Sequence, residues 1–207
     1  MTRVILASAS PRRRELLAAL VPVFDVLPAA IAEQLTADPI ADCERLARDK
    51  ARHVAAQAPP GSIVIGADTI VFRDGRSYGK PDSPGEAAAT LRTLRGAPHF
   101  VVTGLAVVRG DDAEVGYSRA HVTLAPLSDE AIAAYVASGR PLDKAGGYAI
   151  QDDDVPTVAA LDGCYCCVVG LPLWRLRSML ATAGVATPPP DQALARCAAC
   201  PERPAER

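Results

Sequence analysis

The hydrophobic pattern of the chain alternates between short apolar runs and stretches with helical periodicity. The first apolar run, over 4–7, has the length of a short buried strand. Ser10 and Pro11 follow it, and a serine cap before a proline is typical of a helix start. We therefore expect a helix over 11–20, whose leucines fall on one face that packs on a sheet.

Apolar runs and stretches with helical periodicity continue to alternate along the chain. A second helix is expected to begin near Asp38 and Pro39, and its apolar stripe includes Lys50. The β-branched run over 61–72 predicts a buried central strand. Further helices are expected over 83–96, 128–139 and 171–184, and two strands over 99–110 and 114–127 around a turn at 110–112.

Strands and helices interleave without an internal repeat. This order predicts an α/β fold with a mixed, twisted sheet and flanking helices. We expect one domain over 1–187. From 188 onward the chain has three consecutive prolines and no apolar periodicity, so 188–207 are predicted to be a loosely ordered tail.

Composition and charge narrow the classes of function. The 207 residues are 49% hydrophobic and 22% charged with a net charge of −2, and the pI is near 5.9. This is an ordinary globular composition without the basic character of a nucleic-acid-binding or membrane-binding protein. The sequence shows no apolar run near the ~20 residues that span a bilayer. We expect a cytoplasmic protein with neither nucleic acid nor membrane as partner.

Six cysteines raise the question of disulfides or metal. Three of them crowd together at Cys164, Cys166 and Cys167, and no secretion signal precedes them, so we interpret the cysteines as reduced structural or incidental thiols. Cys197 and Cys200 form a C-x-x-C pair in the tail. Because the sequence shows no second pair or histidine near it, this pair predicts zinc only weakly.

The densest positive charge of the chain lies at the expected start of the first helix. Unpaired backbone N–H groups and the positive end of a helix dipole suit a phosphate there. Ser8 and Ser10 add hydroxyl groups, while Arg12 and Arg13 add guanidinium forks for phosphate oxygens. Arg14 points elsewhere and is expected to be solvated. The alternative is a solvated basic first turn, which the helix dipole disfavours.

Asp68 stands in the middle of the expected central strand. A carboxylate buried there is costly unless it is paired, hydrogen-bonded or bound to a metal. Gly66 shortly before it is interpreted as room for a ligand to approach. The alternative is a structural aspartate bonded to Thr69 or to neighbouring backbone.

Three lysines are further candidates for anion binding. Lys50 either extends past the core to solvent or reaches into a cleft. Lys80 lies between a glycine and a proline, a loop setting that can fix it near a ligand, although such a lysine alone is more often solvated. Lys144 precedes two glycines that permit close backbone approach to an anion.

Several common catalytic motifs are missing from the sequence. There is neither a Walker A motif nor a G-x-S-x-G elbow, and the three histidines lack metal-ligand spacing. What remains is arginine, lysine and carboxylate. These groups suit chemistry on a polyphosphate, with cations for the phosphates and carboxylates for a divalent metal and for water.

With these residues in view, the chain resembles the Maf family of nucleoside triphosphate pyrophosphatases. The matching segments follow the family's order over about 3–183. They are LASASPRRRELL, Glu33 in IAEQ, LARDKA around Lys50, GADTIV around Asp68, GKP at Lys80, YVASGRPLDKAGGYAIQ and VVGLPL.

The resemblance implies an elongated α/β fold with a deep central cleft between two lobes, like that of inosine triphosphatases, and a homodimer. It also implies cleavage of a nucleoside triphosphate between its α and β phosphates, which removes selected nucleotides from the pool. Arg12, Thr69 and Gln151 match the branch that acts on dTTP, UTP and modified pyrimidine nucleotides. The alternative substrate is 7-methyl-GTP.

The same resemblance implies that Asp68 is the proton acceptor and that a Mg²⁺ or Mn²⁺ ion is required. The chemistry of the residues agrees, and on that basis we expect Asp68 and Glu33 to hold the ion or the attacking water. Lys50 and Lys80, with Arg12, Arg13 and Lys144, are expected to neutralise the phosphates, and Thr69 and Gln151 to read the pyrimidine edge. Because the family is also connected with cell-division arrest, a nucleotide-sensing regulator that acts through a protein partner is the other hypothesis.

The chain departs from the family pattern at three places. Arg140 stands where the family usually has glutamate, which reverses the local charge. Asp152 replaces the usual glycine and opens an acidic run over 152–154 that either repels phosphate, binds a cation or is a solvated loop. The cysteines at 164–167 replace a serine- and asparagine-rich segment, and the tail has no counterpart that we identify.

Overall fold

A mixed sheet forms the centre of the structure, as the sequence predicts. The computed structural model describes residues 2–152 and 154–205. Within them the strands are β1 (Val4–Leu6), β2 (Asp25–Val26), β3 (Ile63–Arg73), β4 (Arg76–Tyr78), β5 (Pro98–Arg109), β6 (Asp112–Leu124) and β7 (Val158–Gly163). Their order is β2-β1-β3-β5-β6-β7, and β4 pairs with β3 beside this path. β1 runs parallel to β2 and β3, and the other strand pairs are antiparallel.

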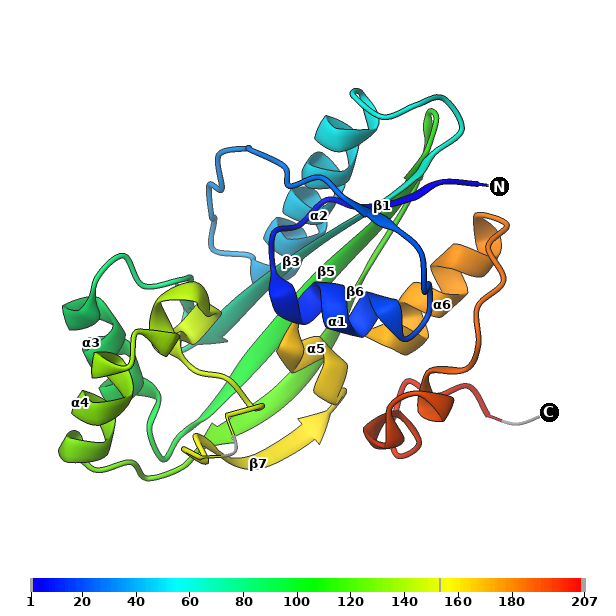
Figure 1. Cartoon of the computed structure of the whole chain (residues 1–207). Coiled ribbons are helices and arrows are strands. Elements are labelled where there is room, and N and C mark those ends of the chain that lie inside the picture. The colour runs from blue at the N-terminus through cyan, green and yellow to red at the C-terminus, as the bar shows by residue number, and fades with distance from the viewer. Residues whose placement is uncertain (1, 153, 206–207) are drawn as a thin grey trace.

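Helices cover both faces of this sheet (Figure 1). The α-helices of the described residues are α1 (Pro11–Ala18), α2 (Pro39–Ala55), α3 (Pro84–Leu94), α4 (Asp129–Ala137), α5 (Tyr165–Val169) and α6 (Leu173–Thr182). Short 3-10 turns are η1 (Arg140–Asp143), η2 (Ala145–Gly147), η3 (Pro190–Gln192) and η4 (Ala195–Cys197).

Side-chain caps confirm the helix starts predicted from the sequence. Ser10, Asp38, Ser83 and Ser128 each accept a hydrogen bond from a backbone N–H in the first turn of α1, α2, α3 and α4. α1 ends at Ala18, two residues before the expected end. The next two backbone N–H groups bond to carbonyls three residues back, so the last turn tightens out of α-helical geometry.

Two glycines let α2 lie against the sheet. A Cβ atom added at Gly66 of β3 would stand 2.1 Å from the backbone oxygen of Ala47, and one at Gly104 of β5 would stand 2.2 Å from that of Cys43. The prediction that Gly66 leaves room for a ligand is wrong. The space above Gly66 is filled by α2, because a helix can approach a sheet this closely only where side chains are missing.

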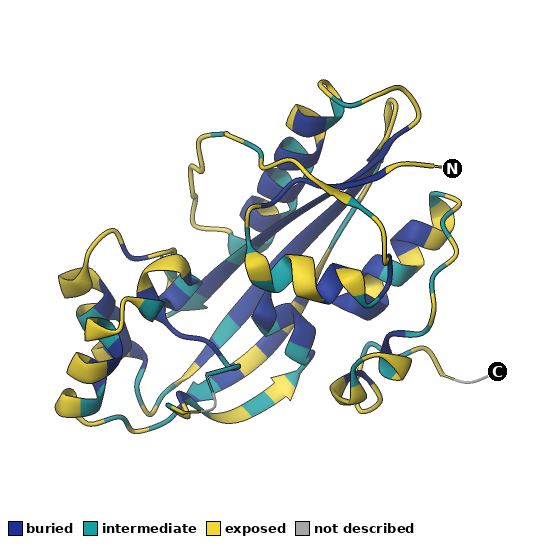
Figure 2. Cartoon of the chain, in the orientation of Figure 1, coloured by how far each residue is buried: buried dark blue, intermediate teal, exposed yellow. Residues whose placement is uncertain are grey.

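The other face of the sheet and its far end carry separate apolar clusters. α1, α5 and α6 pack on β1, β3 and β5 through residues such as Leu17, Ile65 and Leu176. α3 and α4 gather at the other end of the long strands, around Val101 and Ile132 (Figure 1). Of the long strands that connect the two ends, β3 and β5 are buried along most of their length (Figure 2). This elongated arrangement of two lobes agrees with the expected fold.

The tail differs from the loose order expected from its composition. Residues 188–205 turn back onto the main domain through η3 and η4, and Cys197 and Cys200 are buried in the cluster that also holds α5 and α6. The indole nitrogen of Trp174 donates a hydrogen bond to the backbone oxygen of Cys197 at 2.9 Å. The absence of periodicity was misleading here because single buried side chains, rather than a helical face, anchor the segment.

Within the described residues, none of the helices combines the length and the apolar character that a membrane span requires.

The close contact between α2 and the sheet can be tested with Gly66→Ala. The added methyl group collides with backbone, so we expect the free energy of unfolding to fall by about 3 kcal/mol. Gly116→Ala on β6 is the matched control, because its nearest neighbour is the flexible end of Arg175 at 3.4 Å. Urea unfolding would measure both variants. Equal stability of the two would contradict the close packing.

Candidate active site

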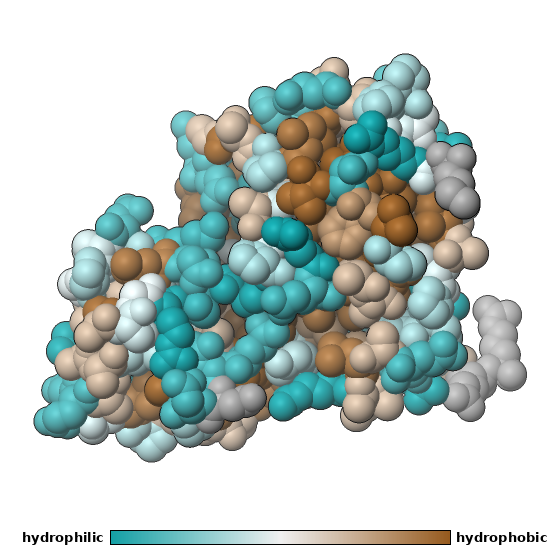
Figure 3. Space-filling view, in the orientation of Figure 1, coloured by the Kyte–Doolittle hydropathy of each residue, from teal (hydrophilic) through white to brown (hydrophobic). Residues whose placement is uncertain are grey.

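A cleft of about 790 Å³ opens between the two lobes. On the face that it occupies, hydrophilic side chains gather between the α3–α4 end and the α1 end (Figure 3). All site residues predicted from the sequence line this one cleft. They are Ser8, Ser10, Arg12, Arg13, Glu33, Lys50, Asp68, Thr69, Lys80, Lys144 and Gln151. The volume lies in the range of ordinary small-molecule sites.

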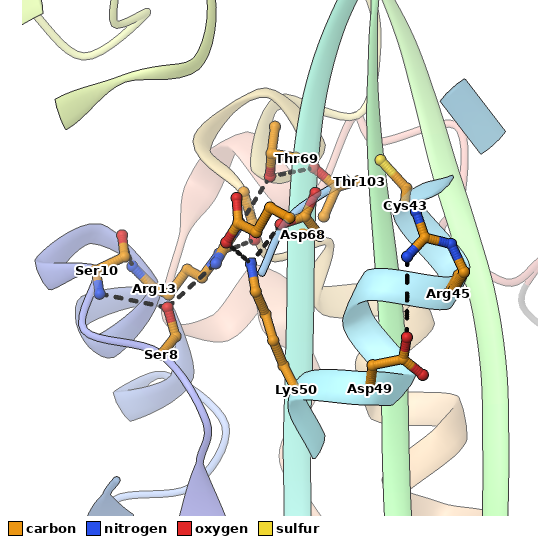
Figure 4. A network of polar contacts seen from close by, with 12 residues as sticks. Ser8, Ser10, Arg13, Cys43, Arg45, Asp49, Lys50, Asp68, Thr69 and Thr103 are labelled. Atoms are coloured by element: carbon orange, nitrogen blue, oxygen red, sulfur yellow. Dashed lines mark hydrogen bonds and ion pairs between the residues drawn. The ribbon is translucent and has the colours of Figure 1, made fainter. Parts of the chain in front are cut away.

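Lys50 of α2 reaches the floor of the cleft and pairs with two carboxylates. Its Nζ atom lies 2.5 Å from Oδ1 of Asp68 and 2.5 Å from Oε1 of Glu33. Lys50 and Asp68 are only 8% and 6% exposed, and Figure 4 shows the lysine extending from α2 to the aspartate on β3. Of the two alternatives for Lys50, the structure therefore supports the cleft. Asp68 is paired with this lysine and not with Thr69.

The two carboxylates have different protonation preferences. Burial raises the pKa of Asp68, although the charges of Lys50 and Arg13 oppose this shift. Burial acts in the same sense on Glu33, but the hydrogen bond and charge of Lys50 outweigh it and lower the pKa of Glu33. Neighbouring acids whose pKa values are pushed apart are typical of sites that transfer protons.

Arg13 is locked in place by three hydrogen bonds from its guanidinium group. Nε donates to the backbone oxygen of Gly170 at 2.8 Å, Nη1 to Oγ of Ser8 at 3.1 Å, and Nη2 to Oγ1 of Thr69 at 3.0 Å (Figure 4). A guanidinium group has five N–H bonds. These contacts use three of the five, so two N–H bonds of Arg13 are left for a ligand. The prediction that Arg13 binds phosphate can therefore hold for only part of its donors.

A chain of hydroxyl groups continues from Arg13 across the sheet. Oγ1 of Thr69 lies 2.9 Å from Oγ1 of Thr103, which donates to the backbone oxygen of Cys167 at 2.7 Å. Because a hydroxyl group has one hydrogen, Thr103 cannot also donate to Thr69. Thr69 must therefore donate its hydrogen to Thr103. Towards the cleft, the oxygen of Thr69 can then only accept a hydrogen bond.

Arg12 and Lys144 come from opposite lobes, and both pair with Asp143. Nη1 of Arg12 lies 2.8 Å from Oδ2 of Asp143, and Nζ of Lys144 lies 2.7 Å from Oδ1 of the same residue. Nζ of Lys144 also donates to the backbone oxygen of Arg140 at 2.6 Å. This bridge holds two cations side by side at the mouth of the cleft, where phosphate oxygens can take the place of the carboxylate.

The remaining predicted residues are less constrained. Lys80 is exposed on the rim, and its charge helps to lower the pKa of Glu33. Gln151 is partly buried. Ser10 accepts the backbone N–H of Arg13 as the cap of α1. Arg14 is exposed, as expected.

The donor set suits a hard divalent cation that arrives with phosphate. In the described chain, no group of three or more His, Cys, Asp and Glu side chains is arranged to hold a metal by itself. Mg²⁺ is commonly held by one or two carboxylates together with substrate phosphates. Asp68 and Glu33 offer two such carboxylates, and Lys50 lies between them.

Arg140 and Asp152, the two charged departures from the family pattern, both have partners in the structure. Nη1 of Arg140 pairs with Oδ1 of Asp154 at 2.7 Å, and its guanidinium carbon lies 5.1 Å from the ring centroid of Tyr135. Asp152 accepts a hydrogen bond from the hydroxyl of Tyr135. Asp153, in the middle of the acidic run, lies outside the described residues.

Sequence reasoning missed three contributors to the site. Thr103, Asp143 and the carbonyl of Gly170 act through contacts with residues far away in the sequence. Thr103 left one signal, because it is a lone hydroxyl within an apolar strand. No signal in the sequence marks Asp143 or the carbonyl of Gly170.

Five cations and four carboxylates face one cleft in a mixed α/β domain, which is an arrangement suited to an enzyme that acts on a polyphosphate. The profile of the Maf-like protein family matches residues 3–183, so the chain belongs to this family. The resemblance seen in the sequence motifs is thereby confirmed.

Individual relatives are similar over nearly the whole chain. A dTTP/UTP pyrophosphatase of Thermomicrobium roseum is 48% identical over 208 residues, which cover 98% of this chain and 95% of the relative. One of Moorella thermoacetica is 48% identical over 189 residues, covering 89% and 97%. A nucleoside-triphosphatase / dITP/XTP pyrophosphatase of Mycobacterium abscessus, known as a crystal structure, has a TM-score of 0.38 at 17% identity over 61% of this chain and 76% of the other. That likeness is too low to carry an inference.

The hydroxyl chain predicts a measurable loss of stability in Thr103→Val. Valine keeps the shape but leaves the buried carbonyl of Cys167 without its donor, so the free energy of unfolding should fall by about 1–3 kcal/mol. Thr123→Val on the neighbouring strand β6 is the control, and urea unfolding is the measurement. A Thr103→Val protein as stable as its control would show that this hydrogen bond contributes nothing.

Proposed function

We propose that this chain hydrolyses dTTP and UTP to the nucleoside monophosphate and pyrophosphate. The observation that carries the proposal is the buried Lys50–Asp68 pair in a cleft lined by cations. The names of relatives 48% identical over most of the chain support the substrates. The three residues that match the pyrimidine branch, Arg12, Thr69 and Gln151, all line the cleft.

The cations take up the triphosphate. Arg12 and Lys144 exchange Asp143 for phosphate oxygens, and Lys80 approaches from the rim. The two free N–H bonds of Arg13 add to them. Because Arg13 is held by three hydrogen bonds before substrate arrives, it stabilises the charge that develops on the departing pyrophosphate at little cost in reorganisation.

Asp68 acts as general base on the attacking water. Burial raises the pKa of Asp68, which favours proton uptake, while Lys50 opposes this shift and orients the carboxylate. Water adds to phosphorus, its proton passes to Asp68, and the bridging P–O bond between the α and β phosphates breaks. The electron pair of that bond leaves with pyrophosphate.

Asp68 and Glu33 would hold a Mg²⁺ or Mn²⁺ ion together with the phosphates. When bound, such an ion neutralises phosphate charge and favours ionisation of water. Glu33 suits this position because its lowered pKa keeps it charged. The role of the metal stays a prediction, as do the homodimer, the cytoplasmic location and the link to cell-division arrest.

Thr69 supplies the discrimination between pyrimidines. Its hydroxyl hydrogen is committed to Thr103, so it presents only an acceptor to the base. Uracil and thymine carry an N–H at N3, whereas cytosine carries an acceptor there. The amide of Gln151 can complement the neighbouring carbonyl groups. A site built for an N–H donor rejects a base that lacks it, because buried acceptors would then face each other.

The catalytic role of Asp68 is tested by Asp68→Asn. We expect kcat/KM for dTTP to fall by about 10²–10⁴, since the amide cannot accept the proton of water. Asp49→Asn is the matched control, because Asp49 lies on α2 outside the cleft lining and pairs with Arg48 at 3.5 Å. Pyrophosphate release would be measured for both. Activity of Asp68→Asn within a few-fold of its control would refute the general base.

The substrate assignment is tested with dTTP, UTP, CTP, dGTP and 7-methyl-GTP, each with Mg²⁺, with Mn²⁺ and with EDTA. We expect pyrophosphate from dTTP and UTP with metal only, and little from CTP. Thr103→Val frees the hydroxyl hydrogen of Thr69 and should narrow the ratio of UTP to CTP turnover.

Three other results would contradict this assignment. Preference for 7-methyl-GTP would support the alternative substrate, and binding of nucleotide without pyrophosphate release would support the regulator. Full activity in EDTA would exclude the metal role of Asp68 and Glu33.

A further inference from the structure

Four of the six cysteines come together at one place, away from the cleft. Cys164 and Cys166 lie at the start of α5, and Cys197 and Cys200 lie in the tail. Sγ of Cys166 is 3.6 Å from Sγ of Cys197. The thiol of Cys164 is in hydrogen-bonding contact with both Cys166 and Cys200. None of the four is more than 8% exposed, and all are free thiols.

We propose that these four cysteines bind one zinc ion, which fastens the tail to α5. Zinc bound to four thiolates is tetrahedral with Zn–S distances of about 2.3 Å, which places neighbouring sulfurs about 3.8 Å apart. The separation of Cys166 and Cys197 agrees with this value within 0.2 Å. A C-x-C pair from one segment and a C-x-x-C pair from another supply the complete set of ligands.

The buried thiols suit a divalent metal ion. Thiolates in a buried site need a compensating positive charge, which zinc supplies. Oε2 of Glu202, two residues beyond Cys200, is buried without a hydrogen-bond partner among the described residues. Zinc binding would displace the protons of the four thiols.

The ligands must close up to bind the ion. Through residues 2–152 and 154–205, no three His, Cys, Asp or Glu side chains already surround a common point. The thiol contacts instead run from Cys197 through Cys166 and Cys164 to Cys200. Cys197 and Cys200 belong to one turn, in which the N–H of Cys200 donates to the carbonyl of Cys197 at 3.3 Å. Binding of an ion therefore calls for movement of these two side chains towards a common point.

Few buried side chains anchor the tail. Of the residues described beyond 187, only Pro190, Cys197 and Cys200 are buried. Small segments with so few apolar anchors are commonly fixed by a metal or a disulfide. A metal at this place would also steady α5, whose first turn carries two of the ligands. The carbonyl of Gly170 at the other end of α5 accepts the hydrogen bond from Arg13.

Metal analysis of the purified, reduced protein tests the site. We expect about one zinc per chain after gel filtration in a weak chelator. Refolding with cobalt in place of zinc should give the visible absorption bands of tetrahedral cobalt bound to thiolates. Metal-free protein should unfold at a midpoint lower by roughly 5 °C or more. These measurements use the wild-type chain and do not depend on a variant that folds.

Variants locate the ion. Cys197→Ser combined with Cys200→Ser should reduce zinc to background. Cys43→Ser is the matched control, because Cys43 is equally buried but donates to the backbone of Val102 far from the cluster. Asp68→Asn should keep its zinc, which separates this site from the proposed catalytic cleft. The zinc measurements therefore test this site independently of the proposed pyrophosphatase activity.

Four results would overturn the proposal. They are an absence of zinc with four thiols free to react after unfolding, disulfides between these cysteines in mass spectra under non-reducing conditions, iron in place of zinc, and zinc that persists in the double serine variant but is lost in Asp68→Asn.

Discussion

The site depends on one buried ammonium group that is shared by two carboxylates. Removing Lys50 from water is costly, and only the close contacts with Asp68 and Glu33 compensate for it. Those contacts require α2 to lie directly on the sheet, which in turn requires Gly66 and Gly104 beneath it. The close packing of α2 on the sheet therefore also sets the position of the ion pairs in the cleft. A side chain on either glycine would lift the lysine away from its partners.

A second constraint runs from α5 to the cleft through hydrogen bonds of fixed direction. The carbonyls of Cys167 and Gly170 accept from Thr103 and Arg13, and both of these donors also contact Thr69. Because carbonyl groups only accept, the hydroxyl hydrogens of Thr103 and Thr69 both have a fixed direction. A backbone carbonyl of α5 thus decides which kind of hydrogen bond Thr69 can offer towards the cleft.

Sequence patterns predicted the local features and missed those made by distant segments. Caps such as Ser10 and Asp38 were predictable because a cap acts on the three residues that follow it. The partner of Arg12, by contrast, lies 131 positions along the chain, and nothing local marks Asp143 for that role. β4, β7 and α5 are too short for periodicity to reveal. The tail shows the same limit, since the thiols of Cys166 and Cys197 stand 31 positions apart.

The charge of the cleft bears on which form of substrate it accepts. Five cations are nearly balanced by four carboxylates, and most of the cations are already paired. A bare triphosphate would bring further negative charge against Asp68, Glu33 and Asp143, and like charges at close range oppose binding. A triphosphate complexed with a divalent cation brings less negative charge, and Asp68 and Glu33 can bind that cation. The charges of the cleft therefore support the proposal that the substrate binds as its metal complex, which the cations alone would not do.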